Sequence, residues 1–457
     1  MGGFSYVDTV AHIIRALMGI MSVWLMFLLV YQLVISVFGF RKNTKNYQDF
    51  EPQLRFLVLV PAHNEEVVVA DIVNNLKQMQ YPKELYDFYI LADNCEDHTA
   101  AVVREMGANV IESFKESENA PTGKPIVLQK ALKNLGDYHK KYDMVMFFDA
   151  DNLIDPNMFS EVNSQYLSND GDVDIIQCYL GAKNKKGLIA FFYYITYTIT
   201  NRFFQYAKSR LGINSVIGGT GFAVAADYLH QRGGWTSMSL TEDFELQIEA
   251  TCDGKRILWN HNVRIYDEKP TRFRASLRQR IRWAQGHWFV TFKNTPKLLR
   301  AFKDRRISFK EFLSTFLYMY SLTPHVILAL NLVFTIVLSA LEWRGIVAAS
   351  SAMGIDFNVT GIVLFFYSFI LLFYIGDYMD NGIRFHLRSF IPMLISVLFN
   401  SLLASLAQII GLFKYKQQDS WVKTEHSINA EDSNTLPPVT EKAVTFHAVP
   451  NQKKKTA

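Results

Sequence analysis

The run Phe56-Leu57-Val58-Leu59-Val60-Pro61 decides the fold class of this chain, because it is short, continuously apolar and ends at a proline. Such a run is typical of a strand that is buried on both faces of a parallel sheet. Similar runs lie at residues 88–92, 145–148 and 175–179, and helical patterns lie between them at 65–79, 99–106 and 125–135. Strands that alternate with helices predict a doubly wound, Rossmann-like α/β domain.

This α/β domain is flanked by apolar segments. The chain has 457 residues, a net charge of +4 and 49% hydrophobic residues, which excludes a disordered acidic chain and a nucleic-acid-binding arm. Residues 16–40 carry no charged side chain and are long enough to cross a bilayer. They end in Phe38-Gly39-Phe40 rather than in small residues, so we expect a transmembrane helix and not a cleaved signal peptide.

Charges around these segments predict the orientation in the plasma membrane. Arg41, Lys42 and Lys45 follow the first helix, whereas only Arg15 precedes it. The positive-inside rule therefore places the α/β domain in the cytosol. Its three cysteines, Cys95, Cys178 and Cys252, suit reduced thiols in that compartment.

Three further apolar runs follow, at 312–341, 359–375 and 390–413. Pro324 interrupts the first run, which is either an interfacial helix plus a span or two short spans, so the number of crossings stays open. The expected domains are an N-terminal transmembrane helix (1–45), the cytosolic α/β domain (46–270), interfacial amphipathic helices (271–311), a C-terminal transmembrane region (312–413) and a largely disordered cytosolic tail (414–457).

Polar residues follow the predicted strands. His63-Asn64-Glu65 follows the first strand, Asp93-Asn94 the second and Asp149-Ala150-Asp151 the third. Ligands of open α/β sheets bind beyond the carboxyl ends of the strands, where these residues are expected to converge. Two carboxylates spaced as in Asp149 and Asp151 can approach one hard cation and the phosphates it carries, although aspartates also favour ordinary turns.

Several other segments each allow two interpretations, one functional and one structural. Lys124 follows a flexible loop and starts a helix, where its ammonium can meet a diphosphate or simply face solvent. Asp243 follows Thr241-Glu242 at a helix start; it can act as a general base, or the segment can be an acidic first turn capped by Thr241. The glycine-rich segment 218–221 allows the backbone to approach a ligand closely, or marks a turn.

Gln279, Arg282 and Trp283 are spaced so that they share one face of a helix. Trp offers an apolar plane for a sugar ring, Gln a hydrogen-bonding amide and Arg a charge for phosphate. The surrounding arginines also fit a basic amphipathic helix at a membrane surface. The two interpretations are compatible.

Taken together, the segments 60–66, 92–94, 149–151, 241–243 and 279–283 resemble the ordered motifs of membrane-bound family 2 glycosyltransferases, the processive synthases of cellulose, hyaluronan and related β-linked polysaccharides. This resemblance implies a GT-A fold, a UDP-sugar donor, Mg²⁺ or Mn²⁺, and a role for each motif. It implies Asp243 as the catalytic base and Asp151 as the metal ligand. The donor-binding residues that it implies are Pro61, Asn64, Glu65, Asp93, Lys124, Asp149, Gln279, Arg282 and Thr424, and the acceptor-binding residues are Gly219, Thr220, Glu242 and Trp283.

Thr424 lies in the segment 421–426, which resembles the gating segment of such synthases, although His426 replaces the expected Lys or Arg. If this match is right, the segment is cytosolic and the region after residue 312 crosses the membrane an even number of times.

The function expected from the resemblance is processive, inverting synthesis of a β-linked polysaccharide, with glucose as the favoured sugar and secretion through the protein's own channel. One alternative is a single addition to a lipid acceptor, because some lipid glucosyltransferases share these motifs. A degenerate transport or binding protein is a further alternative, disfavoured by the complete set of carboxylates. Linkage, product length, homo-oligomerisation and accessory subunits are not specified by the sequence.

Overall fold

The computed structural model describes residues 6–117, 120–344, 353–384 and 386–418. Its central feature is an eight-stranded sheet with the order β3-β2-β1-β4-β7-β6-β8-β5. The strands are β1 Phe56–Ala62, β2 Tyr86–Asp93, β3 Asn109–Ser113, β4 Met144–Phe147, β5 Leu153–Ile154, β6 Ile175–Ala182, β7 Phe222–Ala225 and β8 Ile257–Asp267. The four predicted strands correspond to β1, β2, β4 and β6, and the expected α/β fold is confirmed.

The sheet is parallel from β3 to β4 and becomes mixed beyond it. β1 pairs in parallel with both β2 and β4, whereas β7 is antiparallel to β4 and to β6. β6 and β8 are parallel, and the short β5 pairs antiparallel with β8. Since β1, β2 and β4 run in the same direction, the residues that follow them gather at one edge of the sheet.

The apolar pattern of β1 explains why this strand is central. Phe56, Val58 and Val60 face one hydrophobic core, while Leu57 and Leu59 face the second core on the other side of the sheet. All five side chains are fully buried. A strand covered on both faces needs apolar residues at every position, which is the pattern of the sequence.

The helices of the α/β domain, called the catalytic domain below, cover the sheet and include the three that the sequence predicts. These are α2 Val69–Lys77, α3 Thr99–Glu105, α4 Lys124–Leu135, α5 Tyr138–Lys141, α6 Met158–Leu167, α7 Leu188–Ile199, the π-helix η3 Thr200–Tyr206, α8 Ala207–Arg210, α9 Ala226–Gln231 and α10 Glu242–Cys252. Short 3-10 helices lie at Phe38–Phe40 (η1) and Lys83–Leu85 (η2). α2 begins four residues later than predicted, because Asn64 has φ of 57° and the chain turns before the helix.

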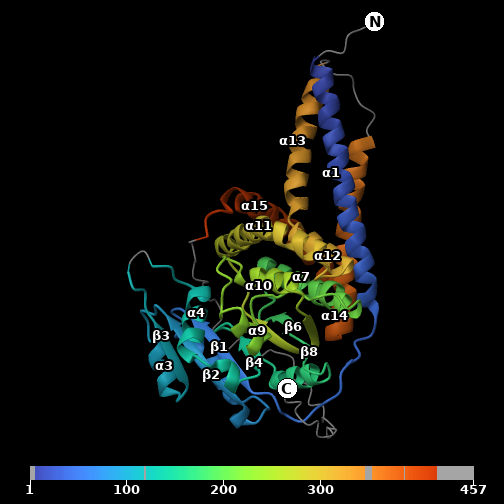
Figure 1. Ribbon diagram of the computed structural model, residues 1–457. Helices are drawn as coiled ribbons and strands as arrows, with labels where there is room; N and C mark the ends of the chain where they lie inside the picture. The colour runs from blue at the N-terminus through green and yellow to red at the C-terminus, as the bar shows by residue number, and fades with distance from the viewer. Residues whose placement is uncertain (1–5, 118–119, 345–352, 385, 419–457) are drawn as a thin grey trace.

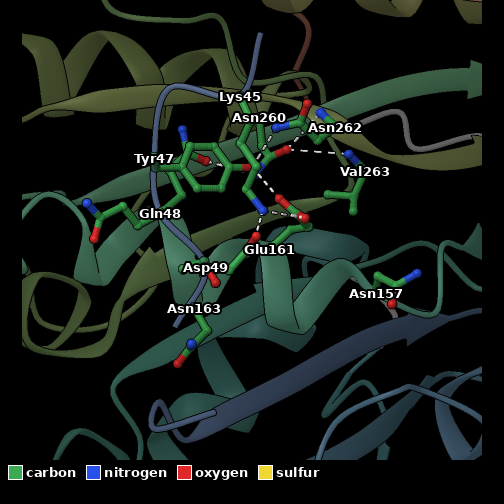
Figure 2. A network of polar contacts seen from close by, with 12 residues as sticks. Lys45, Tyr47, Gln48, Asp49, Asn157, Glu161, Asn163, Asn260, Asn262 and Val263 are labelled. Carbon is green, nitrogen blue, oxygen red and sulfur yellow. Dashed lines mark hydrogen bonds and ion pairs between the residues drawn. The ribbon is translucent and has the colours of Figure 1, made fainter. Parts of the chain in front are cut away.

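A helical assembly stands on one side of this domain (Figure 1). It contains α1 Tyr6–Val37, α11 Phe273–Lys303, α12 Phe309–Met319, α13 Thr323–Trp343, α14 Met353–Asn381 and α15 Leu387–Lys414. α1 and α13 rise together, and α11 runs across the base of α13 (Figure 1). Pro324 lies in the first turn of α13, where proline is tolerated, so the first C-terminal run is the short α12 followed by the long α13.

Within the described residues, three helices are long and apolar enough to cross a membrane: Tyr6–Phe40, Thr323–Trp343 and Phe390–Lys414. Specific polar contacts join the first two. Arg15 pairs with Glu342 at 2.9 Å, and the Trp24 indole donates a hydrogen bond to Thr323 Oγ1 at 2.9 Å. α1 and α13 therefore form an antiparallel pair. The length and apolar composition of the three helices indicate a membrane protein.

Candidate active site

A cleft of about 510 Å³ opens beyond the carboxyl ends of β1, β2 and β4. Its walls come from these strand ends, from the start of α4, from the glycine-rich segment before β7, and from α10 and α11. This is the position at which open α/β sheets bind ligands. Most of the candidate residues predicted from the sequence line this one cleft.

Lys124 connects three parts of the cleft. Its ammonium lies 2.7 Å from Asp149 Oδ1, donates to the Gly219 carbonyl at 2.6 Å and lies 3.7 Å from Glu242 Oε1. Burial disfavours the charge, but attraction to Asp149 and Glu242 outweighs it and raises the pKa of Lys124 above its ordinary value. A permanent cation is therefore held between the strand ends and α10, where it can neutralise a diphosphate.

One end of the cleft is shaped by the turns after β1 and β2. Asp93 accepts a hydrogen bond from the Gly123 N–H at 3.0 Å, and burial raises the pKa of this carboxyl. His63 contacts the Asp93 carbonyl at 2.6 Å. Asn64 does not line the cleft: its side-chain oxygen accepts from the Glu96 N–H at 2.7 Å and joins the two turns.

The turn after β4 presents Asp149 and Asp151 to the cleft. The Asp149 N–H donates to Asn152 Oδ1 at 3.0 Å and to Thr220 Oγ1 at 3.1 Å, and the Asn152 amide donates to Asp151 Oδ1 at 3.1 Å. These bonds fix the backbone so that both carboxylates project from the same turn. Thr220 thereby acts on the position of Asp149.

The oxygen-rich surroundings of this turn fit a hard divalent cation. Asp267, at the end of β8, lines the same cleft; one of its oxygens pairs with Lys269 at 2.6 Å, and the other, Oδ1, is buried without a hydrogen-bond partner. Within the described residues, no group of three or more His, Cys, Asp or Glu side chains is arranged to hold an ion alone. An ion here would take its remaining ligands from a bound phosphate or from water, as Mg²⁺ commonly does.

Glu242 and Asp243 form the acidic first turn of α10. Burial, opposed by Lys124 and reinforced by Asp243, raises the pKa of Glu242 to about 7. Burial also raises the pKa of Asp243 above its ordinary value. Asp243 Oδ2 lies 3.2 Å from the position that a Cβ on Gly219 would occupy, so the glycine, at φ of 83°, leaves room for this carboxylate. A buried carboxylate with a raised pKa is a suitable proton acceptor.

α11 brings Gln279, Arg282 and Trp283 to the cleft. The Tyr193 hydroxyl donates to Gln279 Oε1 at 3.0 Å, and the Tyr193 and Trp283 rings pack edge to face with centroids 6.1 Å apart. Arg282 lies close enough to Glu242 to lower its pKa. The three side chains share one helix face as predicted, and Tyr193 holds two of them.

The close packing of α11 against α10 depends on Gly286. A Cβ at this position would lie 2.6 Å from Thr241 Oγ1 and 2.8 Å from the Thr241 backbone nitrogen. The next residue, His287, stacks on Phe244 with centroids 4.4 Å apart and hydrogen-bonds to the Met319 carbonyl at 2.8 Å. Burial lowers the pKa of His287 to about 4, so the ring is neutral.

The opposite end of the cleft reaches the helices outside the catalytic domain. Tyr318 of α12, Leu322 before α13 and Gln408 of α15 line it there. Sequence reasoning missed these residues, and also Asp267 and His287. Asp267 is the last residue of β8, a strand that the sequence pattern does not reveal, so no local signal points to it. The others are brought in by packing between distant segments.

The cleft thus unites most of the candidates, namely Pro61, Glu65, Asp93, Lys124, Asp149, Asp151, Gly219, Thr220, Glu242, Asp243, Gln279, Arg282 and Trp283. Asn64 lies just outside it. Thr424 lies outside the residues that the structure describes.

Comparison with known proteins gives one family match. Residues 52–286 match the family described as "Glycosyltransferase like family 2". The chain is 26% identical over 306 residues to the probable glycosyltransferase YdaM of Bacillus subtilis, which covers 65% of this chain and 71% of that protein. It is also 26% identical over 265 residues to the beta-monoglucosyldiacylglycerol synthase of Trichormus variabilis, covering 55% of this chain and 54% of the synthase. The chain thus spans about half the length of that synthase.

Among solved structures, the mannosyltransferase PcManGT from Pyrobaculum calidifontis, in complex with GDP-Man and Mn²⁺, has a similar fold. The TM-score is 0.55 at 17% sequence identity, and the match covers 85% of this chain and 99% of that chain. The likeness extends over the GT-A-type domain and much of the helical assembly.

Proposed function

This chain belongs to the glycosyltransferase-like family 2, and on that premise we propose that it transfers a hexosyl group, with glucose favoured, from a UDP-sugar to a lipid acceptor at the membrane surface, with inversion of configuration. The single observation that carries the proposal is the extent of the cleft. It runs from Asp93 and Lys124 at the strand ends to Tyr318, Leu322 and Gln408 beside the membrane helices. A donor enters at the first end, and an acceptor with an apolar anchor enters at the second.

In the proposed reaction, the acceptor hydroxyl oxygen attacks the anomeric carbon while the bond between that carbon and the diphosphate oxygen breaks. Asp243 accepts the hydroxyl proton, and the bonding electron pair leaves with the diphosphate. Lys124 stabilises the charge that develops on the leaving diphosphate. The acceptor hydroxyl attacks from the face opposite the leaving diphosphate, so the anomeric centre is inverted. An α-linked donor therefore gives a β-linked product.

The other cleft residues position the two substrates. Asp93 is assigned to the nucleoside, with Pro61 and Glu65 nearby. Gln279 and Arg282 are assigned to the diphosphate, and Trp283 to the acceptor sugar, for which its indole provides an apolar plane. Glu242 is close to Lys124 and Asp243, so its charge state changes the pKa of both groups.

Asp151 is proposed to hold Mg²⁺ or Mn²⁺, with Asp149 beside it and the donor phosphates completing the coordination. When bound, the cation neutralises charge on the leaving diphosphate.

Single addition to a lipid is preferred over polymer secretion on geometric grounds. Within the described residues, the long apolar helices outside the catalytic domain are α1, α13, α14 and α15. A closed ring of four helices, each about 10 Å across, leaves a central gap of only about 4 Å, which is narrower than a pyranose ring with its hydroxyl groups. Even with all four of these helices counted as crossings, one chain would therefore not surround a polysaccharide.

Processive synthesis of a β-linked polysaccharide is the second candidate. It is favoured by Trp283, whose ring is held edge-on by Tyr193 beside the proposed base and suits a saccharide acceptor. In that case a second copy or another subunit would have to complete the channel.

Product length distinguishes the two candidates. The purified protein is incubated with radiolabelled UDP-glucose, Mn²⁺ and either diacylglycerol-containing lipid or no added lipid. We expect one lipid-soluble product that appears only with lipid, as well as loss of the product in the matched Asp243→Asn protein. A ladder or high polymer would support the second candidate, and absence of transfer from any of several nucleotide sugars would contradict both.

A further inference from the structure

Both halves of α15 contact the catalytic domain. In its first half, Ser396 and Asn400 donate hydrogen bonds to the Leu188 carbonyl at 2.6 and 3.1 Å. Just beyond its end, Gln418 Oε1 accepts a hydrogen bond from the Leu240 N–H at 3.0 Å. A helix of this length, about 40 Å, that crossed the bilayer would have its two ends on opposite sides. α15 instead lies across one surface of the catalytic domain.

The middle of α15 is also attached, through α11. The Trp288 indole donates to the Gln408 carbonyl at 3.3 Å, and Arg280 donates to Asn400 Oδ1 at 3.2 Å. A Cβ on Gly411 would lie 2.4 Å from Ala284 Cβ, so the two helices approach closely. Figure 1 shows α15 beside α11, at the base of the rising helices.

α15 has two distinct faces. The face toward α7 and α11 is buried and contains the small or polar residues Ser396, Asn400 and Ala407 together with Met393 and Val397. The opposite face exposes a continuous apolar stripe: Ile391 (66%), Ile395 (49%), Leu398 (45%), Phe399 (40%), Leu402 (74%), Leu406 (46%) and Phe413 (84%). A stripe of this extent needs an apolar partner.

We propose that α15 lies in the plane of the membrane, on the side of the catalytic domain, with this apolar stripe inserted among the acyl chains of the adjacent leaflet. The occupant is lipid, because the stripe is continuous with a helical assembly whose members α1 and α13 expose apolar side chains along their length. Exposed basic residues flank it: Arg272, Arg274 and Arg278 at the start of α11, and Lys416 after α15. Such residues bind anionic lipid headgroups at a membrane surface.

This placement fixes the path of the chain. α13 ends beside the start of α1, where Glu342 pairs with Arg15, and α14 returns to the catalytic domain, where Asp380 pairs with Arg202 and lies 3.1 Å from His261. α13 and α14 are then the two crossings that follow the catalytic domain, and residue 418 lies on the same side as that domain. Gln408 places the embedded helix at the rim of the cleft.

The first test measures depth. A fluorophore is attached to Ile391→Cys, Leu402→Cys or Phe413→Cys in a Cys95→Ser background, in which the remaining thiols Cys178 and Cys252 are buried. Quenching by lipids brominated at defined acyl positions reports the depth of each site. We expect one shallow depth for all three sites. A deep Leu402 between two shallow ends would identify a crossing helix, and no quenching at any site would exclude contact with lipid; either result overturns the proposal.

The second test measures sidedness and does not depend on the apolar stripe. Gln417→Cys is labelled with a membrane-impermeant maleimide in sealed vesicles of known orientation. Lys115→Cys, on the catalytic domain, and Trp343→Cys, at the far end of α13, are the matched controls. We expect Gln417→Cys to be labelled from the same side as Lys115→Cys. Labelling that follows Trp343→Cys would contradict the in-plane helix, whether or not the protein transfers sugar to lipid.

Discussion

At the scale of single residues, the site depends on how Lys124 is shared among acidic groups. It pairs with Asp149 at 2.7 Å and lies 3.7 Å from Glu242. It stabilises both anions without sequestering Asp243, whose raised pKa comes mainly from burial. The arrangement fits the two roles proposed above, with Lys124 and Asp149 on the donor and Asp243 on the acceptor.

Replacing Asp243 by Asn should abolish transfer while leaving donor binding intact. The amide has nearly the same shape but cannot accept the hydroxyl proton, and loss of a general base typically costs about 10²- to 10⁴-fold in rate. Steady-state transfer and calorimetric binding of UDP-sugar test this pair of outcomes. Asp227→Asn, an exposed aspartate on α9, is the matched control. Retained turnover of purified Asp243→Asn would refute the assignment.

Replacing Glu242 by Gln should move the acid limb of the pH–kcat/KM profile to lower pH. The base must be ionised, so activity appears as pH rises through its raised pKa and is lost as pH falls below it. Removing the Glu242 carboxylate removes a negative charge that repels ionised Asp243. It also leaves the positive charge of Lys124 to act on Asp243, and both effects lower the pKa of Asp243. An acid limb that moved to higher pH in Glu242→Gln would show that Glu242 is not coupled to the base in this way.

At the scale of elements, the positions of the side chains in the site depend on the close packing of α11 against α10. Gly286 permits the backbone contact with Thr241, and Tyr193 of α7 orients the patch on α11 from the other side. Gln279 and Trp283 of this patch are therefore positioned both by the packing of α11 on α10 and by Tyr193.

Gly286→Ala should displace α11, because the new Cβ has only 2.6 Å to Thr241 Oγ1. Overpacking of this kind usually costs about 1–3 kcal/mol in stability, and a shift of about 1 Å in positioning groups can reduce the rate about 100-fold. Thermal unfolding in detergent and transfer assays test both effects. Gly19→Ala in α1 is the matched control, since no atom lies within 4 Å of its Cβ position. Equal unfolding temperatures and equal transfer rates of the two variants would contradict this account of the packing between α11 and α10.

The elements also show what the sequence alone can predict. The strands β1, β2 and β4 are recognisable because each is apolar at nearly every position, and the carboxylates after them follow directly. β8 is not recognisable, because Asn260, His261 and Asn262 interrupt its pattern. Asp267 at its end was therefore missed. The composition of residues 390–413 predicts a crossing helix, whereas the in-plane placement proposed above rests on contacts such as those of Ser396 and Gln418 with distant residues.

At the scale of the whole molecule, the catalytic domain is joined to the helical assembly by several independent contacts. Arg202 of the π-helix η3 hydrogen-bonds to the Gly39 carbonyl after α1 and pairs with Asp380 of α14. α11 and α15 pack against each other beside the cleft. In the proposed membrane placement, these contacts fix the height of the cleft relative to the leaflet, which suits an acceptor that is itself confined to the membrane.

The configuration of the newly formed glycosidic bond tests the central claim most directly, because inversion by a single base is the step on which the assignments depend. Transfer from α-linked UDP-glucose labelled with ¹³C at the anomeric carbon, followed by NMR of the isolated product, reports this configuration. The account predicts a β-linked glucoside. An α-linked glucoside would show retention and would contradict direct displacement with Asp243 as the base.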